Sequence, residues 1–151
     1  MENKPICEID KAGTRWWRLN GIFHREDGPS VEYQNGTKMW YFNGKLHRED
    51  GPAIELVSGT KKWYINGLPH RLDGPALEFC HGGEQWWVDG QLHRLDGPAK
   101  IYSDGGKEWH INGYDVTDII PDWANENDID LDNLTDVDKA LIKIVWSDYG
   151  K

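Results

Sequence analysis

Short runs of alternating apolar and polar residues recur at a constant interval along most of this chain. Each run is centred on a tryptophan, and the second residue after the tryptophan is again apolar. The five pairs are Trp17 and Leu19, Trp40 and Phe42, Trp63 and Ile65, Trp86 and Val88, and Trp109 and Ile111. Alternation with a period of two places the members of each pair on one face of a strand. The pattern therefore predicts five equivalent strands with a shared apolar seam.

Turn-forming residues separate these runs at matching positions. Each tryptophan run ends in Asn-Gly or Asp-Gly, pairs that tolerate positive φ and reverse or bend the chain. A His-Arg pair, an Asp-Gly-Pro corner and a second alternating run follow in four of the units. The units begin at Gly13, Gly36, Gly59, Gly82 and Gly105, 23 residues apart, and residues 5–9 match a half unit. A fixed period of this kind is typical of stacked repeats. Residues 1–113 are therefore predicted to form an elongated, single-layer antiparallel β-meander of hairpins.

The repeat pattern breaks off before residues 114–151, which are expected to form an acidic linker and an α-helical cap. Thr117 is expected to cap a helical turn that runs to Trp123. Thr135 and Asp138 match a capping box at the start of a longer helix. The apolar residues at helical spacing in that helix are Val137, Ala140, Leu141, Ile144 and Val145. We expect this face to cover the last hairpin, because a stacked array needs its open end closed.

Charge is distributed unevenly between these two parts of the chain. Residues 1–113 carry 16 acidic and 14 basic side chains, whereas residues 114–151 carry 10 acidic and 3 basic ones. The lack of a basic footprint argues against binding to duplex nucleic acid. No apolar run of about 18 residues and no signal-peptide pattern are present, which predicts a soluble cytoplasmic protein without a membrane span. Cys7 and Cys80 fall about three units apart, on the order of 30 Å in a sheet, so both are expected to be free thiols.

The features of each unit together resemble MORN and MORN-like repeats, in a variant form known from uncharacterised bacteriophage and bacterial proteins. The variant unit reads Trp-Tyr-x-Asn-Gly-x-x-His-Arg-x-Asp-Gly-Pro-Ala, as at residues 63–76. The resemblance covers residues 5–113 and implies a phage-encoded hairpin array that acts as a binding or scaffolding module, in some cases with membranes or by self-association. Because Arg-x-Asp-Gly-Pro replaces the usual His-Gly-x-Gly segment, the lipid and partner sites of common MORN repeats are not carried over.

The repeated His-Arg-x-Asp sets invite an enzymatic interpretation, since these residues are common in acid-base chemistry. A catalytic site needs one asymmetric constellation, however, and here four copies share the same surroundings. We therefore predict no enzymatic activity and assign these residues to a structural corner, in which His bonds a turn carbonyl and Arg pairs with Asp beside Gly-Pro. The corner residues are His24, His47, His70, His93, Asp27, Asp50, Asp73 and Asp96.

No metal or other cofactor is predicted. Equivalent histidines in successive hairpins lie roughly 10 Å apart, whereas two ligands of one zinc ion, each at about 2 Å, lie within half that distance. Residues 128–132 begin like a calcium loop, but Asn133 and Lys139 replace its glycine and its bidentate glutamate. Cys80 and His81 are neighbours in an extended strand and point to opposite faces, so no cysteine nucleophile is expected.

A second repeated row is formed by the residue after each tryptophan, on the opposite face of the strand. The row consists of Arg18, Tyr41, Tyr64, Trp87 and His110. Outward aromatic side chains at a regular spacing are either covered or bind a ligand. In the structural interpretation, the Arg and His stems of the corners cover the row, or the sheet curls and buries both faces. In the functional interpretation, Tyr41, Tyr64 and Trp87 form a ligand stripe for bases, sugars or apolar partner residues. The anion contacts beside them would come from Arg48, Arg71 and Arg94.

We therefore expect a non-enzymatic binding protein that engages a host protein, as a phage counter-defence factor would. The acidic residues 114–138 would complement a basic partner. The alternative is a binder that sequesters a nucleotide or cyclic-oligonucleotide signal between the aromatic row and the Arg row, in one version across a dimer. A glycan- or cell-wall-binding module ranks lower, because choline- and glucan-binding repeats lack the His-Arg-x-Asp-Gly-Pro corner.

Overall fold

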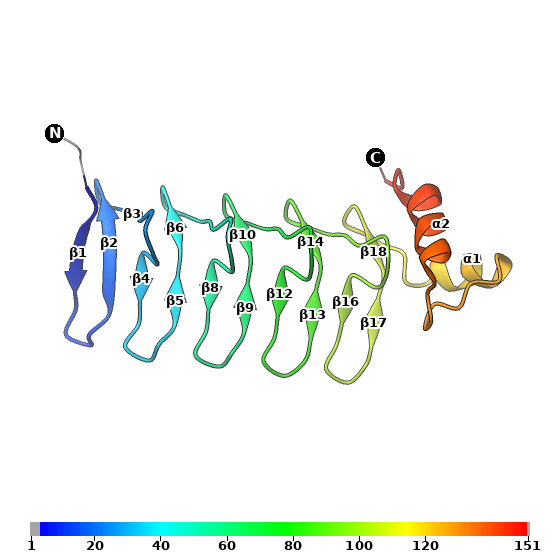
Figure 1. Ribbon diagram of the computed structural model, residues 1–151, viewed down its shortest axis with the longest axis horizontal. Coiled ribbons are helices and arrows are strands. Elements are labelled where there is room, and N and C mark those ends of the chain that lie inside the picture. Colours follow the sequence, from blue (N-terminus) through cyan, green and yellow to red (C-terminus); the bar gives the residue numbers. More distant parts are fainter. Residues whose placement is uncertain (1–3, 151) are drawn as a thin grey trace.

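The computed structural model describes residues 4–150 and shows a mainly β protein with two helices at its C-terminal end (Figure 1). The hairpins follow one another along one direction, and both helices lie beyond the last of them. No helix in the described part of the chain covers a face of the sheet. The expected antiparallel β-meander of hairpins with a C-terminal helical cap is confirmed.

The main sheet has eleven strands, all paired antiparallel with their neighbours. They are β1 (Ile6–Ile9), β2 (Arg15–Leu19), β3 (Ile22–Phe23), β4 (Val31–Glu32), β5 (Lys38–Met39), β8 (Ile54–Glu55), β9 (Lys61–Lys62), β12 (Leu77–Glu78), β13 (Glu84–Gln85), β16 (Lys100–Ile101) and β17 (Lys107–Glu108). Their order is β1-β2-β4-β5-β8-β9-β12-β13-β16-β17, and β3 pairs with β2 away from this path. Strands that are neighbours in this order are thus hydrogen-bonded to each other, and the order follows the chain.

Four units contain a second, shorter hairpin that the sequence pattern did not predict. These hairpins join β6 (Tyr41–Phe42) to β7 (Lys45–Leu46), β10 (Tyr64–Ile65) to β11 (Leu68–Pro69), β14 (Trp87–Val88) to β15 (Gln91–Leu92), and β18 (His110–Ile111) to β19 (Tyr114–Asp115). In each of these units, the tryptophan lies between the main-sheet hairpin and the short hairpin and is hydrogen-bonded on both sides. Trp40 donates its N–H to the Ala53 carbonyl of the main sheet (2.8 Å), and its own carbonyl accepts from the His47 N–H (3.1 Å). The predicted single strand is therefore two short strands with Trp between them.

The tight turns of the short hairpins explain the recurring Asn-Gly pairs. Asn43 and Gly44 have φ values of 49° and 77°, and the equivalent pairs in the other units are also left-handed. Two consecutive residues with positive φ form the two-residue turn that matches the twist of a hairpin, and Asn and Gly adopt it at low cost. Neighbouring short hairpins are joined by backbone bonds, such as Arg48 N–H to the Tyr64 carbonyl (3.1 Å). Each unit therefore bonds to the next on two levels.

The array has little hydrophobic interior of its own. Ala53, Ala76 and Ala99, whose carbonyls accept from the tryptophan N–H groups, are fully buried, and Ser30 occupies the same place in the first unit. A hydrophobic core forms instead where the last hairpin meets the helices. It consists of Trp109, Ile111, Val116, Ile120, Ile142 and Trp146. The C-terminal segment thus closes the open end of the array.

The two helices are α1 (Ile120–Glu126) and α2 (Asp136–Trp146), and they differ from the sequence expectation in two respects. The predicted capping box of Thr135 and Asp138 is present. The predicted apolar face of α2 is wrong, because Val137 and Ile144 are 76% and 78% exposed. The helix buries Ile142 and Trp146 instead, since the large Trp ring removes more apolar surface from water than Val or Ile can.

The expected helix cap at Thr117 is also wrong. α1 begins after Ile119 and has no side-chain cap. The Thr117 hydroxyl accepts a hydrogen bond from the Trp109 N–H (2.9 Å) and so extends the backbone pairing of the last hairpin. The Thr117 hydroxyl is therefore used in a tertiary hydrogen bond and not as a helix cap. The sequence alone does not reveal this hydrogen bond.

Two further expectations concern thiols and membranes. Cys7 and Cys80 are both free and exposed, as predicted. None of the helices in the described residues is both long enough and apolar enough to cross a membrane.

The buried face of α2 can be tested with two substitutions on the same helix. We expect Trp146→Ala to lower the free energy of unfolding by about 3 to 5 kcal/mol, because it empties a buried aromatic site. Ile144→Ala is the matched control and should change it by no more than about 0.5 kcal/mol, because Ile144 is exposed. Urea unfolding followed by circular dichroism measures both. Equal losses for the two variants would contradict the observed orientation of α2.

Candidate functional site

A guanidinium group stacked on a tryptophan ring forms the corner of each of the first four units. The Cζ atom of Arg48 lies 4.0 Å from the centroid of Trp40, and that of Arg71 lies 4.0 Å from the centroid of Trp63. The equivalent pairs are Arg25 with Trp17 and Arg94 with Trp86. A cation over an aromatic face is attracted by the ring quadrupole. The corner thus covers one face of each tryptophan with the flat side of a charged group.

Hydrogen bonds hold the guanidinium group in place on the ring. Arg48 Nε donates to Asp50 Oδ1 (2.8 Å), and its Nη1 donates to the Pro52 carbonyl (3.2 Å) and to Glu55 Oε1 (3.0 Å). A Cβ atom at Gly51 would lie 2.9 Å from Arg48 Cζ, so the corner needs glycine before the proline. This arrangement explains the Arg-x-Asp-Gly-Pro pattern as a set of contacts around one side chain.

The aspartates of these corners are accordingly held in the charged form. The hydrogen bond from Arg25, Arg48 or Arg71 lowers the pKa of the partner carboxyl below its ordinary value at Asp27, Asp50 and Asp73. Burial acts to raise the pKa of Asp96, but the hydrogen bond and charge of Arg94, together with the charge of Lys143, outweigh it, and the pKa lies below its ordinary value. These carboxylates therefore remain ionised and bound to Arg across the neutral pH range.

The histidines of the corners bond to the next unit, which corrects the expectation of a bond to a turn carbonyl. His47 Nδ1 accepts a hydrogen bond from the Asn66 N–H (3.1 Å), and His70 Nδ1 accepts one from the Asp89 N–H (3.1 Å). His24 and His93 make the same bond to Asn43 and Asn112. The partner N–H belongs to the left-handed residue of the next Asn-Gly turn. Each histidine therefore links two successive units.

The corner of the third unit offers a test of the Arg–Trp contact. We expect Arg71→Ala to lower the free energy of unfolding by about 1 to 2 kcal/mol, from the lost cation–π contact and an unpaired Pro75 carbonyl. Lys61→Ala removes an exposed charge of the same sign and should have an effect within about 0.5 kcal/mol. Urea titration of both variants gives the comparison. A loss for Arg71→Ala no larger than that of the control would show that the stacked guanidinium is dispensable.

The opposite face of the sheet carries the predicted aromatic row. Tyr41 directs its hydroxyl to Met39 Sδ (3.8 Å), and Trp87 donates from Nε1 to Gln85 Oε1 (3.0 Å). These contacts between residues two apart place the row on the side that the tryptophan and arginine of the corner do not occupy. Tyr41, Tyr64 and Trp87 are half-buried. The expectation that corner stems cover the row is therefore wrong, because the arginines stack on the other side.

Cross-strand pairing extends this row into a continuous apolar surface. Within the short hairpins, Tyr41 lies opposite Leu46, Tyr64 opposite Pro69, and Trp87 opposite Leu92. In the main sheet below them, Val31, Met39 and Ile54 are directly paired. Phe23 contacts Tyr41 with ring centroids 5.4 Å apart. We call this surface the aromatic face, and its residues are Phe23, Met39, Tyr41, Leu46, Ile54, Tyr64, Pro69, Leu77, Trp87 and Leu92, with Lys62 paired between Ile54 and Leu77.

The structure does not combine the aromatic row with the arginines into one stripe. Arg48, Arg71 and Arg94 stack on Trp40, Trp63 and Trp86, which alternate in sequence with the aromatic row. Their side chains are only 21% to 23% exposed, and their Nε and Nη1 atoms already donate to carboxylates and carbonyls. A nucleotide stacked on the aromatic row of one chain would therefore not reach these guanidinium groups.

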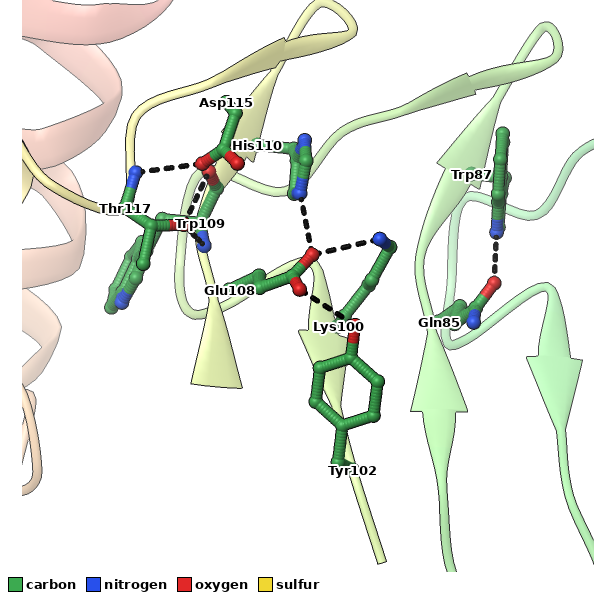
Figure 2. A network of polar contacts seen from close by, with 9 residues as sticks. All are labelled: Gln85, Trp87, Lys100, Tyr102, Glu108, Trp109, His110, Asp115 and Thr117. Atoms are coloured by element: carbon green, nitrogen blue, oxygen red, sulfur yellow. Dashed lines mark hydrogen bonds and ion pairs between the residues drawn. The ribbon is translucent and has the colours of Figure 1, made fainter. Parts of the chain in front are cut away.

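A charged network that the sequence analysis missed lies at the C-terminal end of the aromatic face (Figure 2). Glu108 accepts hydrogen bonds from Lys100 Nζ (2.7 Å), the Tyr102 hydroxyl (2.6 Å) and His110 Nε2 (3.0 Å). These donors lower the pKa of Glu108 from 4.5 to about 2. Lys100 and His110 replace apolar or aromatic residues of the earlier units, whereas Glu108 stands where those units have Met39, Lys62 and Gln85. Cross-strand pairing of Lys100 with Glu108 brings it together, a register that becomes evident only once the strands are aligned.

Acid titration tests this network. Because the folded pKa of Glu108 is lowered, the carboxyl stabilises the fold above its unfolded pKa, and this contribution is lost as the pH falls from 4.5 towards about 2. We expect Glu108→Gln to flatten the loss of stability over this interval relative to the unmodified chain. Tyr102→Phe removes one of the three donors and should give an intermediate slope. The midpoints of urea unfolding, measured across this pH interval, test the expectation. The same dependence of the midpoint on pH in all three proteins would exclude a lowered pKa at Glu108.

No group of three or more metal-ligating side chains that could hold a metal ion occurs among residues 4–150. No protein-family model matches the sequence, and no curated protein is significantly similar to it. The resemblance to MORN-like repeats therefore remains a prediction, and the function has to be argued from the two faces of the array.

Proposed function

We propose that this chain is a non-enzymatic binding protein that docks a partner protein on the aromatic face. The observation that carries the proposal is the continuous apolar surface over the first three hairpins, which neither helix covers. Aromatic and aliphatic side chains dominate the cores of protein interfaces, whereas charged side chains are depleted there. The surface has this composition from Phe23 to Leu77, apart from Lys62 and from Arg18, whose guanidinium lies over the Phe23 ring.

The dimensions of the aromatic face suit a specific protein contact. Six strands at about 4.8 Å and some six residues at about 3.3 Å give a surface on the order of 600 Å². Specific interfaces bury about 800 Å² on each partner. A protein that covers the face and part of its rim therefore buries enough surface for a stable complex.

The residues proposed to anchor the partner are Tyr41, Tyr64 and Trp87. Tyr and Trp are enriched among the residues that dominate binding energy, because they combine a large apolar area with few rotatable bonds. Desolvation raises the pKa of the Tyr41 hydroxyl, in keeping with its half-buried place on the face. Since the repeats resemble phage variants, we propose a bacterial host protein as the partner and interference with that protein as the outcome.

Affinity capture from a bacterial lysate tests this proposal. We expect the triple variant Tyr41→Ala, Tyr64→Ala, Trp87→Ala to lose the captured protein, and calorimetry with that protein, once purified, to show at least about tenfold weaker binding. The control carries Phe42→Ala and Leu68→Ala, two exposed apolar side chains on the other side of the short hairpins. It should bind like the unmodified chain.

Two outcomes would contradict the proposed site. Unchanged capture by the triple variant removes the aromatic face from the interface. Loss of capture by the Phe42 and Leu68 control alone places the interface on the side of the corners. Hydrogen exchange of the complex gives a readout that does not depend on substitution, and it should show protection of β10 and β14.

A further inference from the structure

The side of the sheet opposite the aromatic face contains a row of similar grooves between successive corners. Each groove is lined by a tryptophan, the apolar residue two positions later and a histidine, with corner residues on either side, except that Lys4 and Pro5 replace one set of corner residues in the groove at Trp17. We number these corner grooves from one to four by their tryptophans, Trp17, Trp40, Trp63 and Trp86. The volumes of the second and third are about 570 and 740 Å³.

Each central groove combines an apolar wall with exposed carboxylates. In the second groove the wall is formed by Trp40 and Phe42, and Phe42 is 39% exposed. The side chains of Glu49 and Asp50 at its rim are 83% and 84% exposed, whereas Arg48 is only 21% exposed. The groove therefore presents negative charge to the solvent although an arginine lies within it.

The balance of charge distinguishes the central grooves from the outer ones. The second groove holds four carboxylates against two guanidinium groups, and the third holds three against two. Lys4 brings the first groove to equal numbers of cations and carboxylates, and Lys143 from α2 gives the fourth an excess of one cation. A cationic ligand is therefore favoured at the second and third grooves.

The spacing of the grooves selects the conformation of that ligand. Successive grooves are separated by two strands of the main sheet, which amounts to about 9.5 Å. A polyproline II helix repeats every three residues at about 3.1 Å each, so equivalent side chains recur every 9.3 Å or so. The repeat of a β-strand is about 6.7 Å and that of an α-helical turn about 5.4 Å, and neither matches.

We propose that the second and third corner grooves bind a cationic, proline-rich segment of a partner in the polyproline II conformation. Every third residue enters a groove, where proline packs on Trp40 and Phe42 and, one turn later, on Trp63 and Ile65. Aromatic-lined grooves are a recurrent way to recognise such segments. Lysine or arginine side chains beside the prolines pair with the rim carboxylates. This site is separate from the aromatic face and does not depend on the function proposed for it.

His47 supplies a hydrogen bond that orients the peptide in the second groove, which it lines. His47 Nδ1 accepts from the Asn66 N–H, so the proton of the neutral ring lies on Nε2, 3.7 Å from Glu49 Oε1. The carbonyl groups of a polyproline II segment have no internal partners and can accept from a ring N–H. The Nε2–H of His47 is thus the donor that meets a peptide carbonyl in the second groove.

Calorimetry with synthetic peptides tests the proposal at a fixed, physiological salt concentration. The probe is a peptide of four Pro-Pro-Arg repeats, for which we expect saturable binding of one peptide per chain. Three controls separate charge, conformation and period: four Gly-Ser-Arg repeats, four Pro-Pro-Glu repeats, and three Pro-Pro-Pro-Arg repeats. Each control should bind at least about tenfold more weakly, because it lacks a preformed helix, the positive charge or the three-residue period.

Variants of the chain locate the site without removing the Arg–Asp contacts of the corners. Glu26→Gln with Glu49→Gln removes two exposed carboxylates that do not contact the arginines, and should weaken binding about three- to tenfold. Leu72 stands where the earlier corners have Glu26 and Glu49 and is 79% exposed, so Leu72→Glu should strengthen binding about two- to threefold. Tyr64→Ala, on the aromatic face, is the matched control and should not change it.

The proposal is overturned by any of four results. Absence of binding by the Pro-Pro-Arg peptide at about millimolar concentration excludes the site. Equal binding of the Gly-Ser-Arg peptide would show that the grooves attract any polycation. Equal binding of the Pro-Pro-Pro-Arg peptide would show that the grooves do not require a three-residue period. Loss of binding on Tyr64→Ala, with the Leu72→Glu variant unchanged, would move the peptide to the aromatic face.

Discussion

The stacking of an arginine on a tryptophan at each corner is the contact on which the repeat array depends. A single sheet of short strands buries little apolar surface, and outside the C-terminal core the described array has mainly alanines, a serine and threonines at its fully buried positions. The tryptophans supply the apolar area that is missing, and each arginine covers one face of its tryptophan ring. The Arg48 contacts with Asp50, Pro52 and Glu55 hold the guanidinium over the face of the Trp40 ring. Most of the repeated residues in each unit therefore contact or position the corner arginine.

The fifth unit shows what happens when this contact is absent. Thr117 occupies the position of the corner arginine, and Val116 that of the histidine. Trp109 is nevertheless 4% exposed, because α1 and α2 pack over it together with Ile111 and Val116. Without a following unit there is no Asn-Gly turn for a histidine to bond, so an apolar residue is preferred at that position. The cap thus replaces both the arginine and the next repeat with a conventional hydrophobic core.

Covering the tryptophans on one side leaves the two faces of the sheet with different chemistry. The aromatic face is mainly apolar over three units, with Lys62 between Ile54 and Leu77, and ends in the Glu108 network, which suits a folded protein surface. The corner side presents carboxylates and narrow apolar grooves at a fixed interval, which suits an extended chain. The same period therefore creates two surfaces that recognise different shapes.

The sequence by itself determined the period, the β-hairpins, the left-handed Asn-Gly turns, the free cysteines and the capping box of α2. These features depend on local backbone preferences and on alternation, and both are encoded in neighbouring residues. Only the tertiary structure decided which unit each histidine bonds, since His47 reaches a backbone N–H 19 residues ahead. It also decided that the arginines lie apart from Tyr41 and Tyr64, and that α2 buries Trp146 while Val137 and Ile144 remain exposed. These arrangements depend on contacts between residues that are distant in sequence. Where two arrangements compete, the one that buries more apolar area or forms the better hydrogen bond is adopted once the units are stacked.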